Sequence, residues 1–131
     1  GGSEKPASRE STANGEHFFQ MNGPAVYSTA VDVVPKSIQA ILQKNGRSIE
    51  EVQYLLPHQP SIRILQEIAK RVGLPFEKVK TNMDKYANTS GGTIPIVLDE
   101  TVKAGELSKG DLVLFAAVGA GWTWGTALYQ W

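Results

Sequence analysis

Short apolar runs that alternate with amphipathic stretches constrain the fold of this chain most. Residues 52–57, VQYLLP, and residues 111–118, DLVLFAAV, are apolar along nearly their whole length, and turn residues flank them. Such continuous runs are typical of strands that are buried on both faces of a parallel sheet. Stretches of helical period lie between the two runs. The sequence therefore predicts an α/β layer protein with a mostly parallel sheet.

The first predicted helix covers residues 26–42, where apolar residues recur every three or four positions. Gly46 provides the stop signal after it. Pro35 lies inside this helix and removes one backbone N–H, which costs roughly 3 kcal/mol in a helix interior. We therefore expect a kink or a break after Val31.

The remaining elements follow from caps and periodicity. Ser61 caps a second helix that ends at Gly73, and a third helix is predicted over residues 92–104. Residues 78–81 are interpreted as another short strand, and the alternation in residues 123–131 predicts a final strand after a tight turn. The predicted order is helix, strand, helix, strand, helix, strand, strand.

The N-terminal residues differ in composition from the rest. Residues 1–16 are small, polar and rich in Gly and Ser, without apolar periodicity, which is typical of a surface loop or tail. We divide the chain into a surface segment, residues 1–24, and a folded part, residues 25–131.

The composition excludes several classes of function. Lys and Arg number 13, as do Asp and Glu, so the sequence predicts neither a nucleic-acid partner nor an anionic membrane partner. The count of cysteines is 0, which removes disulfides, thiolate metal sites and a thiol nucleophile. The longest apolar runs reach about half of the ~20 residues that a membrane helix needs. We predict a soluble, cytoplasmic protein.

Polar residues follow the carboxyl ends of the predicted strands. His58 follows the first strand, Asn88 lies beyond the second, and the turn residues 119–121, GAG, follow the third. Each has a simple alternative interpretation: a hydrogen-bonded turn residue, a helix cap and a tight turn, respectively. Together they form a plausible oxyanion-type site, because an imidazole, a carboxamide and exposed backbone N–H groups can all donate to a developing negative charge.

The motifs that contain these residues resemble those of a known family. In order along the chain they are MNG at residues 21–23, LLPHQPSIRIL at 55–65, YANTSGGTIPIVLDE at 86–100 and GAGWTWGTAL at 119–128. They are similar to the C-terminal half of β-ketoacyl-[acyl-carrier-protein] synthase III, a thiolase-fold condensing enzyme that starts fatty acid synthesis.

The resemblance implies a fold and a consequence for folding. The expected fold is the C-terminal half of a thiolase-like αβαβα sandwich, with a final antiparallel strand. The strand order that we attribute to each half is 3-2-1-4-5, so the central strand of the sheet would be missing from this chain. Because such a gap would leave two unpaired strand edges, we expect a fragment that folds only with the N-terminal part bound.

The resemblance also implies an active site. His58 and Asn88 would act with a cysteine from the N-terminal half, and they would donate hydrogen bonds to the enolate that malonyl decarboxylation creates. The backbone N–H of Ala120, between Gly119 and Gly121, would complete a second oxyanion hole. The helix N-terminus at Ser61 would favour neutral His58.

Substrates and partners are implied in the same way. No cofactor is expected, since coenzyme A and phosphopantetheine thioesters are the substrates. Asn22, Gly23 and Pro60 would line the substrate tunnel, and Arg63 would bind acyl carrier protein or be an ordinary exposed helix charge. The implied partners are the cysteine-containing N-terminal half, acyl carrier protein, acyl-CoA and a second copy in a homodimer. The expected compartment is the cytoplasm, or the plastid stroma.

Two other functions stay open from the sequence. One is a non-catalytic module that binds acyl carrier protein or a partner subunit. The other is a relative that transfers acyl groups without decarboxylation. The residues around the nucleophile would decide between them, and this chain does not contain those residues.

Overall fold

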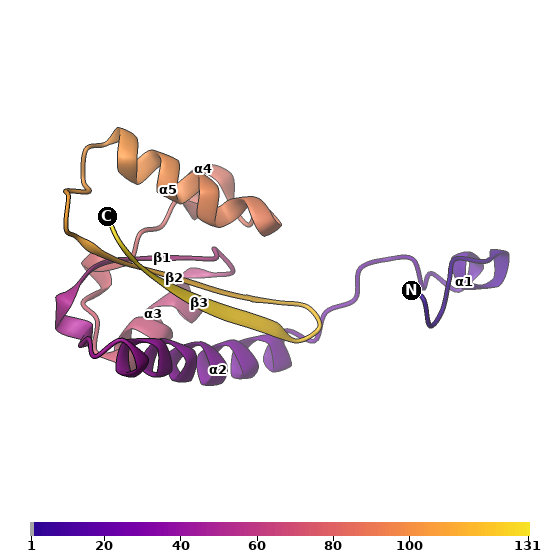
Figure 1. The fold of residues 1–131 in the computed structure, drawn as a ribbon. Coiled ribbons are helices and arrows are strands. Elements are labelled where there is room, and N and C mark those ends of the chain that lie inside the picture. The colour runs from indigo at the N-terminus through magenta and orange to yellow at the C-terminus, as the bar shows by residue number, and fades with distance from the viewer. Residues whose placement is uncertain (1) are drawn as a thin grey trace.

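Three strands form the central sheet of the computed structural model, which describes residues 2–131. Figure 1 shows α2 and α3 on one side of the sheet, α4 and α5 on the other, and α1 on an arm that extends away from this body. The strands are β1 (Val52–Pro57), β2 (Leu112–Gly119) and β3 (Thr123–Gln130). The helices are α1 (Arg9–Ala13), α2 (Gly23–Lys44), α3 (Ile62–Val72), α4 (Met83–Tyr86) and α5 (Thr93–Lys103), with short 3₁₀ turns η1 (Ile49–Glu51), η2 (Phe76–Lys78) and η3 (Ser90–Gly92).

Helices cover both faces of β1 and β2. Leu55 and Leu114 are fully buried in a cluster with apolar residues of α2 and α3. On the opposite face, Leu56 and Val113 pack against Val97 of α5. This two-sided burial explains why both strands are apolar along nearly their whole length. The predicted α/β class is confirmed.

The strand order corrects one expectation. β1 pairs directly with β2 in parallel, with Leu55 opposite Leu114 and Pro57 opposite Ala116. β2 then pairs with β3 in the antiparallel sense, as predicted. The expected unpaired gap between the strands predicted at residues 52–57 and 111–118 is therefore not found, because this chain pairs the two strands with each other. No unpaired strand edge lies between β1 and β2, so the expected dependence of folding on the N-terminal part does not follow from the sheet.

The predicted strand at residues 78–81 reduces to a single bridge. Val79 pairs in parallel with Leu55, and the Lys80 N–H donates to the Leu55 carbonyl at 2.9 Å. Beyond Val79 the side chain of Gln59, and not a strand, forms hydrogen bonds with the backbone of this segment. Its amide donates to the Lys80 carbonyl at 3.1 Å and accepts from the Asn82 N–H at 3.3 Å. A side chain thus satisfies backbone groups that a longer strand would have paired.

Helix α2 continues through Pro35, so of the predicted kink or break after Val31 the break is wrong. Proline leaves the carbonyl one turn earlier, that of Val31, without its helical donor. Arg71 of α3 supplies a replacement, since its Nη1 donates to the Val31 carbonyl at 3.0 Å. Glu67 holds the same guanidinium by accepting from Nε at 2.7 Å. A contact between two helices therefore compensates for the missing bond within one of them.

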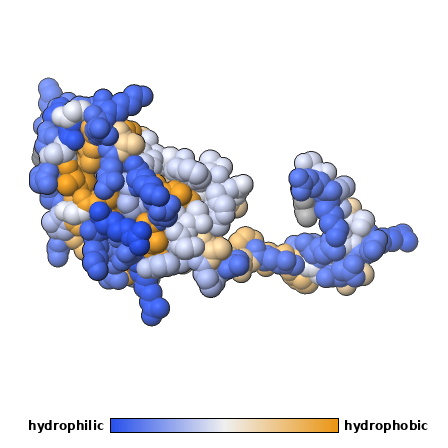
Figure 2. All heavy atoms as spheres, turned by 90° about the horizontal axis from the view of Figure 1, so that it is seen from below, coloured by the Kyte–Doolittle hydropathy of each residue, from blue (hydrophilic) through white to orange (hydrophobic). Residues whose placement is uncertain are grey.

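The N-terminal segment contains one element that composition did not predict. Helix α1 starts with a capping box in which Ser8 and Ser11 each accept a hydrogen bond from the other's backbone N–H. Figure 2 shows the arm as a mostly hydrophilic extension beside the body. The predicted surface segment, residues 1–24, is described from Gly2 onwards, and Gly1 lies outside the described residues.

We predict that Arg71→Ala lowers the free energy of unfolding by about 1–2 kcal/mol, because the Val31 carbonyl loses its donor. In a Pro35→Ala background the cost should be smaller, since that substitution supplies a backbone N–H for the same carbonyl. Urea denaturation of the two single variants and the double variant measures this coupling. An equal cost of Arg71→Ala in both backgrounds would contradict the assignment.

We predict that Gln59→Leu destabilises the protein by about 3 kcal/mol or more. Gln59 is fully buried, and the change leaves the Pro57 and Lys80 carbonyls and the Asn82 N–H without this partner. The matched control is Gln66→Leu on the exposed side of α3, which should stay within about 0.5 kcal/mol of the parent. Equal denaturation midpoints for the two variants would refute the bracing role of Gln59.

Candidate active site

Two adjoining hollows lie at the carboxyl ends of β1 and β2. Their volumes are about 430 and 620 Å³. His58, Asn88, Gly119 and Ala120 line both of them, together with Phe19 and Val118. The structure therefore brings together the three groups that follow the predicted strands. This placement agrees with the rule that ligands of open α/β sheets bind beyond the carboxyl ends of the strands.

The hollows are polar without being charged. Among the described residues that line them, none is Asp, Glu, Lys or Arg. Their polar groups are an imidazole, carboxamides, hydroxyls and the backbone, with apolar side chains between them. A developing negative charge would thus meet hydrogen-bond donors and dipoles in place of a competing carboxylate.

His58 is fixed by its backbone and by its ring. Its N–H donates to the Ala116 carbonyl at 2.7 Å, which continues the pairing of β1 with β2 by one residue. Its ring is half-buried, and Nδ1 lies 2.7 Å from Oγ1 of Thr93. Burial lowers the pKa of His58, and the backbone of Ser90 partly opposes this effect. Neutral His58 is thus favoured near pH 7, with burial as a cause that the sequence did not provide.

Asn88 lies in the loop between α4 and η3. Its Oδ1 accepts from the Ser90 N–H at 2.9 Å, an Asx turn, and within residues 2–131 no hydrogen bond engages its Nδ2. The amide group is therefore oriented with its donors available. The N-cap of α5 is Gly92, so the alternative interpretation of Asn88 as that helix's cap is wrong.

The backbone around Asn88 is strained. Ala87 and Ser90 both have φ of 54°, in the left-handed region that favours glycine. Strain of this kind is concentrated at functional sites, where the surrounding structure over-determines the backbone. The side chain of Asn88 is exposed at the hollow, while the residues beside it have a strained backbone.

Of residues 119–121, Gly119 ends β2, and Ala120 and Gly121 belong to the tight turn, residues 120–122, that connects β2 to β3. Gly119 pairs with Thr123 at the end of the ladder. Gly121 has φ of 139°, and a Cβ there would lie 3.0 Å from Oγ1 of Thr123, so the turn requires glycine at this position. The turn interpretation and the lining of the hollow are compatible. The role of the Ala120 N–H as an oxyanion donor stays a prediction.

The four remaining predicted residues separate into two pairs. Asn22 and Pro60 line the 430 Å³ hollow. Asn22 also caps α2, because its Oδ1 accepts from the Ala25 N–H at 3.1 Å. Gly23, the first residue of α2, and Arg63, exposed on α3, do not line either hollow.

Sequence reasoning missed two residues of the site and underrated a third. Thr93 contacts His58, although the sequence placed it simply near the start of a helix. Phe19 lines both hollows from the arm, which composition assigned to a surface segment. Gln59 entered only as a letter of the motif around His58, yet its side chain braces residues 80–82. Its polarity directly beside a buried strand is a signal that could have indicated this role.

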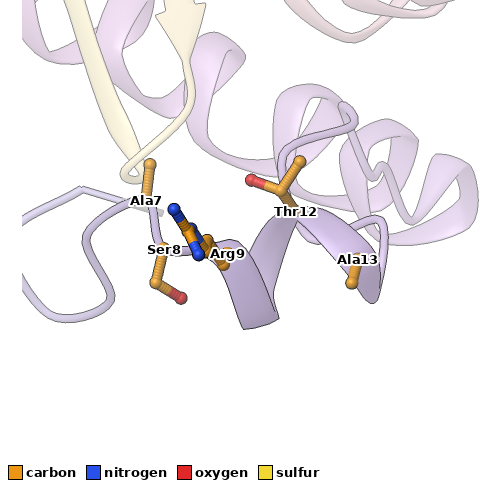
Figure 3. A pocket seen from close by; sticks show the side chains of 5 residues that line it. All are labelled: Ala7, Ser8, Arg9, Thr12 and Ala13. Atoms are coloured by element: carbon orange, nitrogen blue, oxygen red, sulfur yellow. The ribbon is translucent and has the colours of Figure 1, made fainter.

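A third hollow lies on the arm, around α1 (Figure 3). Exposed side chains of one short segment line it, and it contains none of the predicted site residues. Its lining residues are Ala7, Ser8, Arg9, Thr12 and Ala13. With a single arginine that water reaches freely, it is a surface depression of the arm and not a second site.

None of the helices in residues 2–131 is both long and apolar enough to cross a membrane. Over the same residues, no cluster of three or more His, Cys, Asp or Glu side chains could hold a metal ion.

Comparison with known proteins identifies the family. A family model described as 3-Oxoacyl-[acyl-carrier-protein (ACP)] synthase III C terminal matches residues 42–131. A beta-ketoacyl-[acyl-carrier-protein] synthase III of Symbiobacterium thermophilum is 41% identical over all of this chain, and one of Rhodopirellula baltica is 40% identical. The chain spans 40% and 38% of the length of these two curated relatives.

Solved structures give the same result. A 3-oxoacyl-[acyl-carrier-protein] synthase III of Aquifex aeolicus matches 87% of this chain and 37% of its own, with a TM-score of 0.85 at 38% identity. The corresponding enzyme of Pseudomonas aeruginosa matches 97% of this chain and 38% of its own, with a TM-score of 0.87 at 31% identity. The predicted resemblance is confirmed. The chain therefore belongs to the 3-oxoacyl-[acyl-carrier-protein] synthase III family and corresponds to its C-terminal part.

Proposed function

We propose that this chain is the C-terminal part of a condensing enzyme that joins an acyl-CoA starter to malonyl-acyl carrier protein with loss of carbon dioxide. His58 and Asn88 are its catalytic residues. The names of the relatives support the reaction class, and the geometry of this chain supports the roles of the two residues.

The observation that carries the proposal is the uncharged, donor-rich lining around His58 and Asn88. Decarboxylation of a malonyl thioester moves an electron pair onto the thioester oxygen, so the transition state is stabilised by donors that do not compete for that charge. The Ser90 N–H donates a hydrogen bond to Oδ1 of Asn88. This bond fixes the orientation of the amide group, so that Nδ2 can donate to the thioester oxygen.

The proposed reaction has two bond-forming stages. A cysteine of the N-terminal part first takes the acyl group from coenzyme A, and the coenzyme A thiol leaves. The malonyl group then loses carbon dioxide, and its electron pair forms an enolate that hydrogen bonds from His58 and Asn88 stabilise. The enolate carbon attacks the acyl thioester, the new C–C bond forms and the cysteine thiolate leaves. The product is a β-ketoacyl thioester on the carrier protein.

The remainder of the enzyme completes this site. The chain has no cysteine, so we expect the isolated chain to be inactive and the N-terminal part to be an obligatory partner. Acyl carrier protein and acyl-CoA are the proposed substrates, and no cofactor is needed. Asn22, Pro60 and the 119–121 turn line the route along which the phosphopantetheine arm would enter. Arg63, exposed in the first turn of α3, would contact the carrier protein.

We predict that His58→Ala in the full-length enzyme lowers malonyl decarboxylation by about 10²- to 10³-fold, the loss typical of one oxyanion donor. The release of carbon dioxide from malonyl-acyl carrier protein measures this step. The control is His17→Ala, which changes the other histidine of the chain, on the exposed arm. Full activity of His58→Ala, together with tight binding of carrier protein, would instead favour a non-catalytic binding module.

We predict that Asn88→Asp costs at least as much activity as Asn88→Ala. Aspartate keeps the shape of the side chain but replaces the Nδ2 donor with an anionic oxygen beside the enolate, where like charges repel. The KM for the carrier-protein substrate should change little, and kcat should fall. Asn14→Asp at the end of α1 is the matched control and should behave like the parent enzyme. A normal kcat for Asn88→Asp would exclude the donor role.

A further inference from the structure

Thr93 connects His58 to the backbone of the Asn88 loop. Its side chain is buried, with 2% of the residue exposed, and it lies at the first position of α5. Oγ1 of Thr93 is 2.7 Å from Nδ1 of His58 and 3.1 Å from the carbonyl oxygen of Ser90. One hydroxyl group therefore contacts two polar atoms of the site at once.

The number of hydrogens decides the direction of these two bonds. A threonine hydroxyl has one hydrogen to donate and two lone pairs that accept. The Ser90 carbonyl can only accept, so the hydroxyl hydrogen goes to that oxygen. The contact with His58 is then satisfied only if Nδ1 carries a hydrogen and donates it to Thr93. With the opposite tautomer, either the Ser90 carbonyl or the His58 Nδ1 would be left without this partner.

We propose that Thr93 is a positioning residue that holds the proton of neutral His58 on Nδ1, through a relay from Nδ1 to Oγ1 of Thr93 and on to the Ser90 carbonyl. The ring then presents the lone pair of Nε2 to the hollow. The backbone of Ser90 also raises the pKa of His58, as a carbonyl near Nδ1–H would, although burial outweighs it.

With the proton of neutral His58 on Nδ1, Nε2 must take up a second proton before it can donate one to the enolate. The order of proton transfers that follows rests on the proposed function. The cysteine thiol of the N-terminal part supplies this second proton: the S–H bond breaks, sulfur attacks the acyl-CoA carbonyl, and coenzyme A leaves as a thiolate that takes a proton from water. Nε2–H then donates to the enolate. The cysteine thiolate released by C–C bond formation finally recovers the proton from Nε2.

The tautomer can be measured on the chain alone, without any activity. The sequence has 2 histidines, so two-bond ¹H–¹⁵N spectra resolve the ring nitrogens of His58, and His17 on the exposed arm is the internal reference. Above the pKa of His58, the parent and Thr93→Ser should both show a protonated Nδ1 and a bare Nε2. Thr93→Val, which keeps the shape but removes the hydroxyl, should shift His58 towards the Nε2–H form and lower its pKa further.

Two results would overturn the proposal. One is a predominant Nε2–H form in the parent chain, and the other is an unchanged tautomer ratio in Thr93→Val. The backbone amide spectra of the variants report whether each has kept its fold. Thr93→Ser keeps the hydroxyl but loses the methyl group, so it separates the effect of the hydroxyl from an effect of altered packing. Because this measurement follows only the ring, the tautomer result can be negative while His58→Ala still lowers decarboxylation, and the reverse is equally possible.

Discussion

The direct parallel pairing of β1 with β2 is the constraint on which the rest of the structure depends. This pairing places Leu55 and Leu114 on one face of the sheet and Leu56 on the other. The helices on both faces pack against these side chains. The same ladder continues past the last residue of β1, because the His58 N–H donates to the Ala116 carbonyl. The position of the imidazole is therefore set by the sheet itself. A residue placed in this way shares the rigidity of the core, although its ring lies at the surface of a hollow.

Two sets of hydrogen bonds connect the segment around His58 to α5, one at each end of the helix. Gln59 accepts from the Asn82 N–H, and Asn82 Nδ2 donates to Glu100 Oε2 at 2.8 Å. Glu100 lies on α5, and the same helix begins at Thr93, whose Oγ1 contacts His58. Each contact is modest, but together they fix two ends of one helix relative to one strand. The fully buried Gln59 therefore helps to hold α5, the helix that supplies Thr93 as the partner of His58.

Much of the fold could be predicted from the sequence, because two-sided burial leaves a continuous apolar run and helix ends leave caps such as Ser61. Tertiary compensation could not be predicted. Nothing in the sequence around Pro35 indicates that Arg71, on another helix, would serve the Val31 carbonyl. The same reason explains the site. His58 and the 119–121 turn follow strands and could be placed at one sheet edge, whereas the contact of Thr93 depends on how α5 packs.

The two proposed catalytic groups differ in what they can do, and this difference follows from their partners. The Ser90 N–H donates to Oδ1 of Asn88, which fixes the amide group and leaves its Nδ2 hydrogens available as donors. His58 is buried enough to be neutral and is engaged at Nδ1, so it offers a single nitrogen that can accept a proton and later return it. Ser90 serves both, through its N–H to one and its carbonyl to the relay of the other. The strained loop around Ser90 therefore contacts both proposed catalytic groups at the same hollow: the proposed donor, Asn88, through its N–H, and the proposed acid, His58, through Thr93.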